Sequence, residues 1–207
     1  MPQPTPLEHG KYYHVYNRGN NRENIFVEER NYPYFLKLYA HHIEPIAGTF
    51  AYCLMRNHFH LLVRIKTEEE IQKTLRVLKT LRVSSKTLRV YQVFSNFFNA
   101  YTKAINKAYG RTGSLFEHPF GRIQVTSEAY YSHLVIYIHR NPQKHGFVTD
   151  FRDWPYSSYH TLLSTKPTHL KREDVLNWFG DLDNLVATHQ QEITERQIGA
   201  LAPEDFD

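Results

Sequence analysis

Two apolar, aromatic-rich runs stand next to each other in the chain, over residues 49–55 and 59–65, and only Arg56, Asn57 and His58 separate them. Runs of this length and composition are typical of β-strands, and so short a connection joins neighbouring antiparallel strands. The pattern therefore predicts an antiparallel β-hairpin whose strands are central in a sheet. The rest of the chain has to pack around this hairpin.

Helices and further strands are predicted on both sides of the hairpin. Residues 27–43, with Pro33 in the first turn, and residues 94–109 carry apolar side chains every three or four positions, which predicts two amphipathic helices. The other predicted elements are a strand ending near Asn17, a strand over 122–125, a helix capped by Ser127 and ended by Pro142 with Gly146, and short helices over 175–179 and 182–189. The order β-α-β-β-α-β-α predicts an α+β fold: a ferredoxin-like antiparallel sheet with helices on one face, plus short C-terminal helices.

The overall composition is that of a globular protein, because 41% of the 207 residues are apolar and 22% are charged. No apolar stretch approaches the ~18 residues of a membrane span, and the first residues lack the apolar core of a signal peptide, so we expect no membrane association. The single cysteine, Cys53, permits neither an internal disulfide nor a thiolate zinc cluster. These features predict a cytoplasmic protein.

Charge is distributed unevenly along the chain. Residues 71–116 contain nine Lys and Arg and no Asp or Glu, whereas residues 172–207 contain nine acids and two bases. Aromatic residues make up 14% of the chain. A basic, aromatic-rich stretch suits a nucleic acid, because Lys and Arg neutralise phosphates while ring faces stack on unpaired bases. A solvated charged face explains the charge equally well, so charge alone does not decide between the two.

Part of the basic stretch repeats Lys-Thr-Leu-Arg-Val three times, beginning at Lys73, Lys79 and Lys86. Offsets of six and seven residues are too short for a solenoid, so we interpret the repeat as a local duplication. Its bases recur every three or four residues, as in a helix with one basic face, but Thr-Leu-Arg-Val also alternates with period two, as in a strand. The conformation of residues 71–93 stays open.

Two short motifs are suited to chemistry. In His58-Phe59-His60 the histidines lie at i and i+2 in a predicted strand, so both imidazoles point to one face and can bind one metal ion. With 13 histidines in the chain, this pattern also arises by chance. On the late helix, Tyr137 and Asn141 lie one turn apart on the same face, and the Asn141 side chain offers an oxygen to a hard cation.

The neighbours of Tyr137 on this helix are expected to have ordinary roles. Tyr130 and Tyr131 are followed four residues later by apolar residues, which predicts that they pack in the core. His133 and His139 are candidate proton acceptors for Tyr137, although roles on the polar surface are the stronger expectation for both.

The two motifs stand among other segments in a fixed order. These are residues 16–20, 55–63 with His-Phe-His, 109–116, 137–142 with Tyr-x-x-x-Asn-Pro, 145–148 and 154–159. Together, over about residues 8–180, they resemble the single-tyrosine HUH transposases, in the branch related to the REP-associated tyrosine transposases. The resemblance implies an HUH nuclease/transposase domain at 8–150 and a C-terminal aromatic loop with a helical extension at 151–207, packed on the same domain.

The resemblance also implies an activity: a metal-dependent endonuclease and strand transferase that cleaves single-stranded DNA at hairpins. It implies that His58, His60 and Asn141 hold Mg²⁺ or Mn²⁺, which polarises the scissile phosphate. Tyr137 would then attack the phosphorus and leave a 5′-phosphotyrosine and a free 3′-hydroxyl, so that a second strand can be joined without ATP.

The predicted DNA-binding residues come from the matching segments and from the basic stretch. They are Arg18, Asn20, Arg22, Lys103, Lys107, Arg111 and Arg122. Two departures from the family pattern weaken the transfer: the repeat at 71–93, and the lack of an expected basic residue before Phe120. The hairpin recognised, the cleavage sequence, and whether the active site is built within one chain or shared in a homodimer stay open.

Two other functions compete with the transferase. A domesticated hairpin-DNA-binding protein would keep the fold with little or no transposition activity, but mere binding does not require His58, His60, Tyr137 and Asn141. An unrelated protein with a chance His-x-His would have no reason to carry Tyr137 and Asn141 at this spacing.

Overall fold

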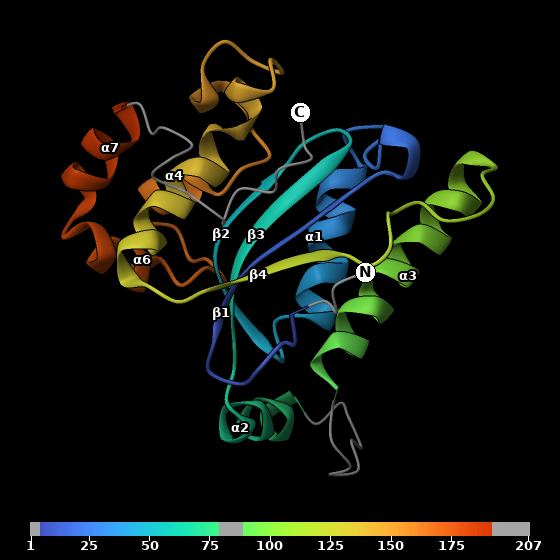
Figure 1. Ribbon diagram of the computed structural model, residues 1–207, viewed down its shortest axis with the longest axis horizontal. Coiled ribbons are helices and arrows are strands. Elements are labelled where there is room, and N and C mark those ends of the chain that lie inside the picture. Colours follow the sequence, from blue (N-terminus) through green and yellow to red (C-terminus); the bar gives the residue numbers. More distant parts are fainter. Residues whose placement is uncertain (1–4, 79–88, 192–207) are drawn as a thin grey trace.

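The structure is a computed structural model that describes residues 5–78 and 89–191, and a four-stranded antiparallel sheet lies at its centre (Figure 1). The strands are β1 (Tyr12–Arg18), β2 (Ala47–Leu54), β3 (His58–Ile65) and β4 (Gly121–Val125). Their order across the sheet is β2-β3-β1-β4, and each neighbouring pair is antiparallel. The predicted hairpin and the ferredoxin-like sheet are therefore confirmed.

One face of the sheet is covered by α1 (Asn31–His42) and α3 (Val90–Tyr109), which lie on the same side of it in Figure 1. The predicted stripe on α3 is confirmed, since its aromatic side chains are buried against alternate residues of β1 and β3. Gly110 ends this helix with a φ of 63°, a left-handed conformation that glycine adopts without a steric penalty.

The other face is covered by α4 (Glu128–Lys144) and α6 (Arg172–Phe179), and α7 (Leu182–Gln190) packs on α6 (Figure 1). The prediction of helices on one face is correct for α1 and α3 but wrong for α4, whereas α6 and α7 are the short C-terminal helices that were predicted in addition. The reason lies in the hairpin strands, which are apolar on both faces: Ala51, Cys53 and Leu62 pack against α4, while Phe59 and Leu61 pack on the opposite side. Both faces of such a strand have to be covered by other elements.

Several element boundaries differ from the prediction. Helix α1 begins at Asn31 instead of residue 27, because the Asn31 side chain accepts hydrogen bonds from the Val27 and Glu28 amides and holds them in a turn. Ser127 is at the N-cap position of α4, but its side chain makes no capping hydrogen bond. Pro142, predicted to end α4, lies inside it, and the helix continues to Lys144.

The first copy of the repeat lies in α2 (Glu68–Leu78), so the helical alternative is confirmed there. The second copy and most of the third fall at 79–88, outside the described residues. Short elements complete the chain: η1 (Asn20–Arg22), η2 (Phe151–Asp153) and α5 (Tyr159–Leu163). Over residues 5–78 and 89–191, no helix is long and apolar enough to cross a membrane.

Candidate active site

The two motif histidines and the candidate nucleophile meet where the start of β3 faces α4. His58 and His60 point toward α4, whereas Phe59 between them packs on the other face against Phe35. The ring centroids of His58 and His60 are 5.3 Å apart, and those of His60 and Tyr137 are 5.6 Å apart. All three side chains are at most 6% exposed. One chain therefore brings the histidines and the tyrosine together without a second copy.

Asn141 is fixed beside Tyr137 and retains one unused acceptor. Its Nδ2 donates a 2.8 Å hydrogen bond to the Tyr137 carbonyl, which orients the side-chain amide. Its Oδ1 is fully buried and accepts no hydrogen bond from any described residue. Leaving such an acceptor unsatisfied costs about 1–3 kcal/mol, so a further donor or a cation at this oxygen would stabilise it.

The histidines are in the form that binds metal ions. The His58 Nδ1 lies 2.8 Å from the Asn57 side-chain oxygen, which only accepts, so Nδ1 carries the proton and Nε2 carries the lone pair. Burial lowers the pKa of His58 to about 3 and lowers that of His60 well below its ordinary value. Both imidazoles are therefore neutral at physiological pH, as a metal ligand must be.

His14 on β1 is a part of the site that the sequence prediction missed. Its Nε2 lies 2.9 Å from Nδ1 of His60, and the two rings stack with their centroids 5.0 Å apart. Both side chains are fully buried. The sequence did contain a signal for His14. Because side chains of a strand alternate between its faces, Tyr12, His14 and Tyr16 lie on one face of β1, which pairs with β3.

Tyr16 and Gly121 shape the same corner. The Tyr16 ring lies 5.1 Å from the His14 ring and 6.1 Å from the His60 ring, measured between centroids. Gly121 pairs with Tyr16 across the sheet, and a Cβ on Gly121 would stand only 2.1 Å from the Tyr16 ring. Glycine is required here because the ring occupies the place of a side chain.

The end of α4 adds two basic groups. The Lys144 Nζ lies 6.0 Å from the centroid of the Tyr137 ring, and the His145 ring lies 4.9 Å from the His58 ring. Positive charge beside a phenol favours its ionised form and attracts phosphate. These two residues follow the Asn-Pro pair after only Gln143, so their position in sequence was a usable signal.

His139 and the early tyrosines of α4 lie elsewhere. His139 is buried and bonded to His189 and Ser158 at 2.8 and 2.7 Å, so the expected role on the polar surface is wrong for it. Tyr131 packs between Tyr12 and Trp178, as predicted, whereas Tyr130 is 38% exposed and its predicted packing is wrong.

Four of the seven predicted DNA-binding residues gather beyond the end of β1. The backbone N–H of Asn20 donates a hydrogen bond to the Leu115 carbonyl, so the segment after β1 lies beside the loop that follows α3. Arg111 in that loop forms an ion pair with Glu23. Arg18 lies 3.5 Å from Glu117. This arrangement brings Arg18, Asn20, Arg22 and Arg111 into one region.

The other three residues are not part of this group. Lys103 and Lys107 are exposed on α3. Arg122 on β4 donates to the Thr5 carbonyl at 2.5 Å, and its guanidinium lies 4.8 Å from the ring centroids of both Tyr91 and Phe120. Its guanidinium is thus already engaged within the chain.

The candidate donor set is two imidazoles and one amide oxygen. Among the residues that the structure describes, no group of three or more His, Cys, Asp or Glu is arranged to hold a metal ion. The candidate set of His58, His60 and Asn141 contains only two such residues, because its third donor is an amide oxygen. Neutral imidazole nitrogens and a buried, unsatisfied amide oxygen are donors that a divalent cation can accept.

Known proteins are similar to this chain in sequence and in fold. No family model matches the chain. A Haemophilus influenzae protein, whose name assigns it to the REP-associated tyrosine transposases, is 27% identical over 112 residues, which are 54% of this chain and 58% of that protein. The chain thus matches little more than half the length of this relative.

A solved structure titled as a REP-associated tyrosine transposase bound to a REP hairpin is similar in fold. The TM-score is 0.59 at 16% identity, and the match covers 81% of this chain and 88% of the other. The Haemophilus influenzae relative, in sequence, and the solved structure, in fold, together confirm the predicted resemblance to the REP-associated tyrosine transposases.

Proposed function

We propose that this protein is a metal-dependent endonuclease and strand transferase that cleaves single-stranded DNA at a hairpin. The observation that carries the proposal is the meeting of Tyr137, His58 and His60 in one buried corner, with the unsatisfied Asn141 oxygen one helical turn further along α4. The name of the Haemophilus influenzae relative and the REP hairpin in the similar structure support DNA as the partner.

His58, His60 and Asn141 would hold the metal ion. When bound, Mg²⁺ or Mn²⁺ supplies Lewis-acid polarisation of a phosphoryl oxygen. The chain itself contributes the preparation of the donors: Asn57 sets the tautomer of His58, His14 fixes the ring of His60, and the Tyr137 carbonyl orients Asn141. Contacts of this kind hold ligands in place before binding.

Tyr137 would act as the nucleophile. Its phenolic oxygen forms a bond to phosphorus while the bond from phosphorus to the 3′ oxygen breaks, which leaves a 5′-phosphotyrosine and a 3′-hydroxyl that takes up a proton. A phenol ordinarily titrates near pH ~10, so the reaction needs help in removing its proton. The Lys144 ammonium, 6.0 Å from the ring, would stabilise the phenolate by its charge.

The competing function is hairpin binding without cleavage. A binding protein has no use for a buried amide oxygen that accepts nothing from residues 5–78 and 89–191, because such an oxygen costs stability. Asn141 therefore favours the enzyme.

The test is covalent attachment. Labelled hairpin-bearing single strands are incubated with the protein and Mn²⁺, and the adduct is resolved on a denaturing gel. We expect an adduct for the wild type and for Tyr130→Phe, an exposed tyrosine on the same helix, and none for Tyr137→Phe. His58→Ala should lose the adduct but keep DNA binding in a gel-shift assay. An adduct from Tyr137→Phe, or none from the wild type on any hairpin substrate, would contradict the proposal.

A further inference from the structure

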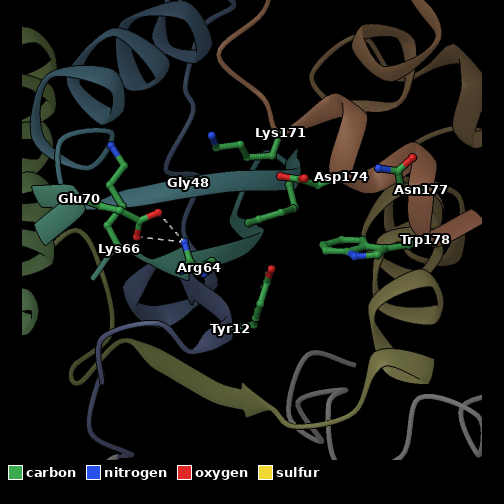
Figure 2. Close-up of a pocket in the computed structure, with 10 residues that line it drawn as sticks. Tyr12, Gly48, Arg64, Lys66, Glu70, Lys171, Asp174, Asn177 and Trp178 are labelled. Atoms are coloured by element: carbon green, nitrogen blue, oxygen red, sulfur yellow. Dashed lines mark hydrogen bonds and ion pairs between the residues drawn. The ribbon is translucent and has the colours of Figure 1, made fainter. Parts of the chain in front are cut away.

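A pocket of about 430 Å³, shown in Figure 2, is lined by Arg64, which lies near the opposite end of β3 from His58. Residues of β1, β2, β3, α2 and α6 line it. Arg64 on its wall follows His60 by four residues of β3, which is about 13 Å along a strand. The pocket is therefore separate from the Tyr137 site but close enough for one bound molecule to reach both.

The floor of the pocket is aromatic. The Trp178 ring stacks on the buried Phe50 ring at a centroid distance of 4.9 Å and an interplanar angle of 20°. The Tyr12 ring stands edge-on to Trp178 at 5.9 Å, and Tyr131 supports both rings from α4. Packing fixes these rings, and a fixed aromatic surface is what a nucleic-acid base stacks on.

Three cationic side chains line the pocket. Arg64 is held by Glu70, whose two carboxylate oxygens each lie 3.1 Å from the guanidinium. The stem of Lys171 lies across Gly48, where a Cβ would stand 3.2 Å from its Cε. Burial, and then the charge of Lys171, lower the pKa of Lys66, while Glu70 and Glu44 act in the opposite direction. The Lys66 Nζ already donates to the Glu44 carbonyl at 2.6 Å, and an anion near both ammonium groups would relieve their repulsion.

The helix α6 presents hydrogen-bonding groups to the same space. Asp174 and Asn177 line the pocket together with Trp178 (Figure 2). Neither side chain makes a hydrogen bond or ion pair with another residue in the described part of the chain. The pocket thus combines a cationic side, an aromatic floor, and acceptors that can receive the amino group of a base.

We propose that this pocket binds one nucleotide, with its phosphate near Lys171 and Lys66, its base on Trp178, and the base amino group facing Asp174. Its volume lies within the range of small-molecule sites. The bound nucleotide can be a free mononucleotide or an unpaired nucleotide of a DNA strand. The second of these ligands rests on the proposed function.

The first experiment uses dGMP, dCMP and dTMP, with quenching of tryptophan fluorescence as the readout. Trp178 lines the pocket, while the other tryptophan, Trp154, is buried elsewhere in the core. Lys171→Gln should weaken the binding of all three nucleotides about tenfold, as expected for the loss of one charge-assisted contact. The matched control is Lys166→Gln, an exposed lysine in the same segment that does not line the pocket, and it should bind like the wild type.

Asp174→Ala tests the contact with the base. Because thymine lacks an amino group, dGMP and dCMP should bind the wild type more tightly than dTMP, and the variant should lose this preference. The same variants are then measured with five-nucleotide single strands. Quenching by mononucleotides assigns the pocket to free nucleotides as well as strands, and quenching by strands alone assigns it to DNA.

Equal affinity of Lys171→Gln, Lys166→Gln and wild type for every probe would overturn the pocket assignment. Formation of the Tyr137 adduct is measured in parallel on the same proteins, which separates the two proposals. If the adduct forms normally and Lys171→Gln has no effect on nucleotide binding, only the pocket proposal is refuted. If nucleotide binding depends on Lys171 but the wild type forms no adduct, the proposed cleavage is refuted and the pocket proposal is retained.

Discussion

Acid should destabilise this protein through histidines that are buried in their neutral form, and His189 on α7 gives the cleanest measure. The His189 Nδ1 lies 2.8 Å from the Leu185 carbonyl, which only accepts, so Nδ1 carries the proton and Nε2 accepts from His139 at 2.8 Å. His139 in turn accepts at Nε2 from the Ser158 hydroxyl, 2.7 Å away. These bonds fix the tautomers of both rings, and protonating His189 at Nε2 would place two donors opposite each other and break its bond to His139.

The magnitude follows from the pKa of His189. Burial lowers this pKa to about 4, against about 6.5 for an unfolded histidine. Between these values the unfolded chain binds a proton that the folded protein does not, so the contribution of His189 is complete above pH 6.5 and is lost as the pH falls toward 4. At 1.36 kcal/mol per pKa unit, the loss is about 3 kcal/mol.

The assay is urea unfolding of the wild type and of His189→Gln at several pH values between 7.5 and 4.5. Glutamine does not titrate, so the slope of unfolding free energy against pH should fall by about 1.4 kcal/mol per pH unit below pH 6. The variant isolates one residue, because His58, His60 and His139 also contribute to the total slope. His41→Gln, at an exposed histidine of α1, is the control. Equal slopes for His189→Gln and the wild type would refute the reasoning.

Three further predictions concern the site and the DNA. Asn141→Ala should raise the Mn²⁺ concentration needed for half-maximal cleavage, whereas a purely structural role at the helix end would lower the Tm and leave the metal dependence unchanged. Gly121→Ala should displace the Tyr16 ring and cost about 1–3 kcal/mol in unfolding free energy, while Gly121→Ala combined with Tyr16→Leu should recover part of it. Replacing Lys103 and Lys107 by Gln should lower the slope of log affinity against log salt by about 1.4 for single strands, and an unchanged slope would remove both from the interface.

The sheet was predictable because its strands differ sharply in composition from their connections. The hairpin at 49–65 was evident from two apolar runs and three polar residues between them. The covering of both faces was less evident, although it follows from the same runs: they are apolar at nearly every position, and an alternating strand would have needed only one layer of helices.

For the site, the sequence predicted only which residues of one strand or one helix lie on the same face. The spacing of His58 and His60 and that of Tyr137 and Asn141 follow from the periods of a strand and a helix. A sequence period does not show which elements become neighbours in the fold. The contacts of His14 and Lys144, and the pocket beside Trp178, could therefore be recognised only in the structure.

The role of His14 shows why the His-x-His motif alone is an incomplete description of this site. A histidine on a strand can rotate about its side-chain bonds, and a buried imidazole without a partner for Nδ1 would be costly. His14 supplies that partner across the sheet, because β1 and β3 pair with Tyr16 opposite His60 and so place His14 on the same face. The antiparallel register therefore fixes the ring of His60 before any ligand arrives. The His-x-His spacing determines on which face of β3 the two histidines lie. The neighbouring strand β1 determines how the ring of His60 is oriented.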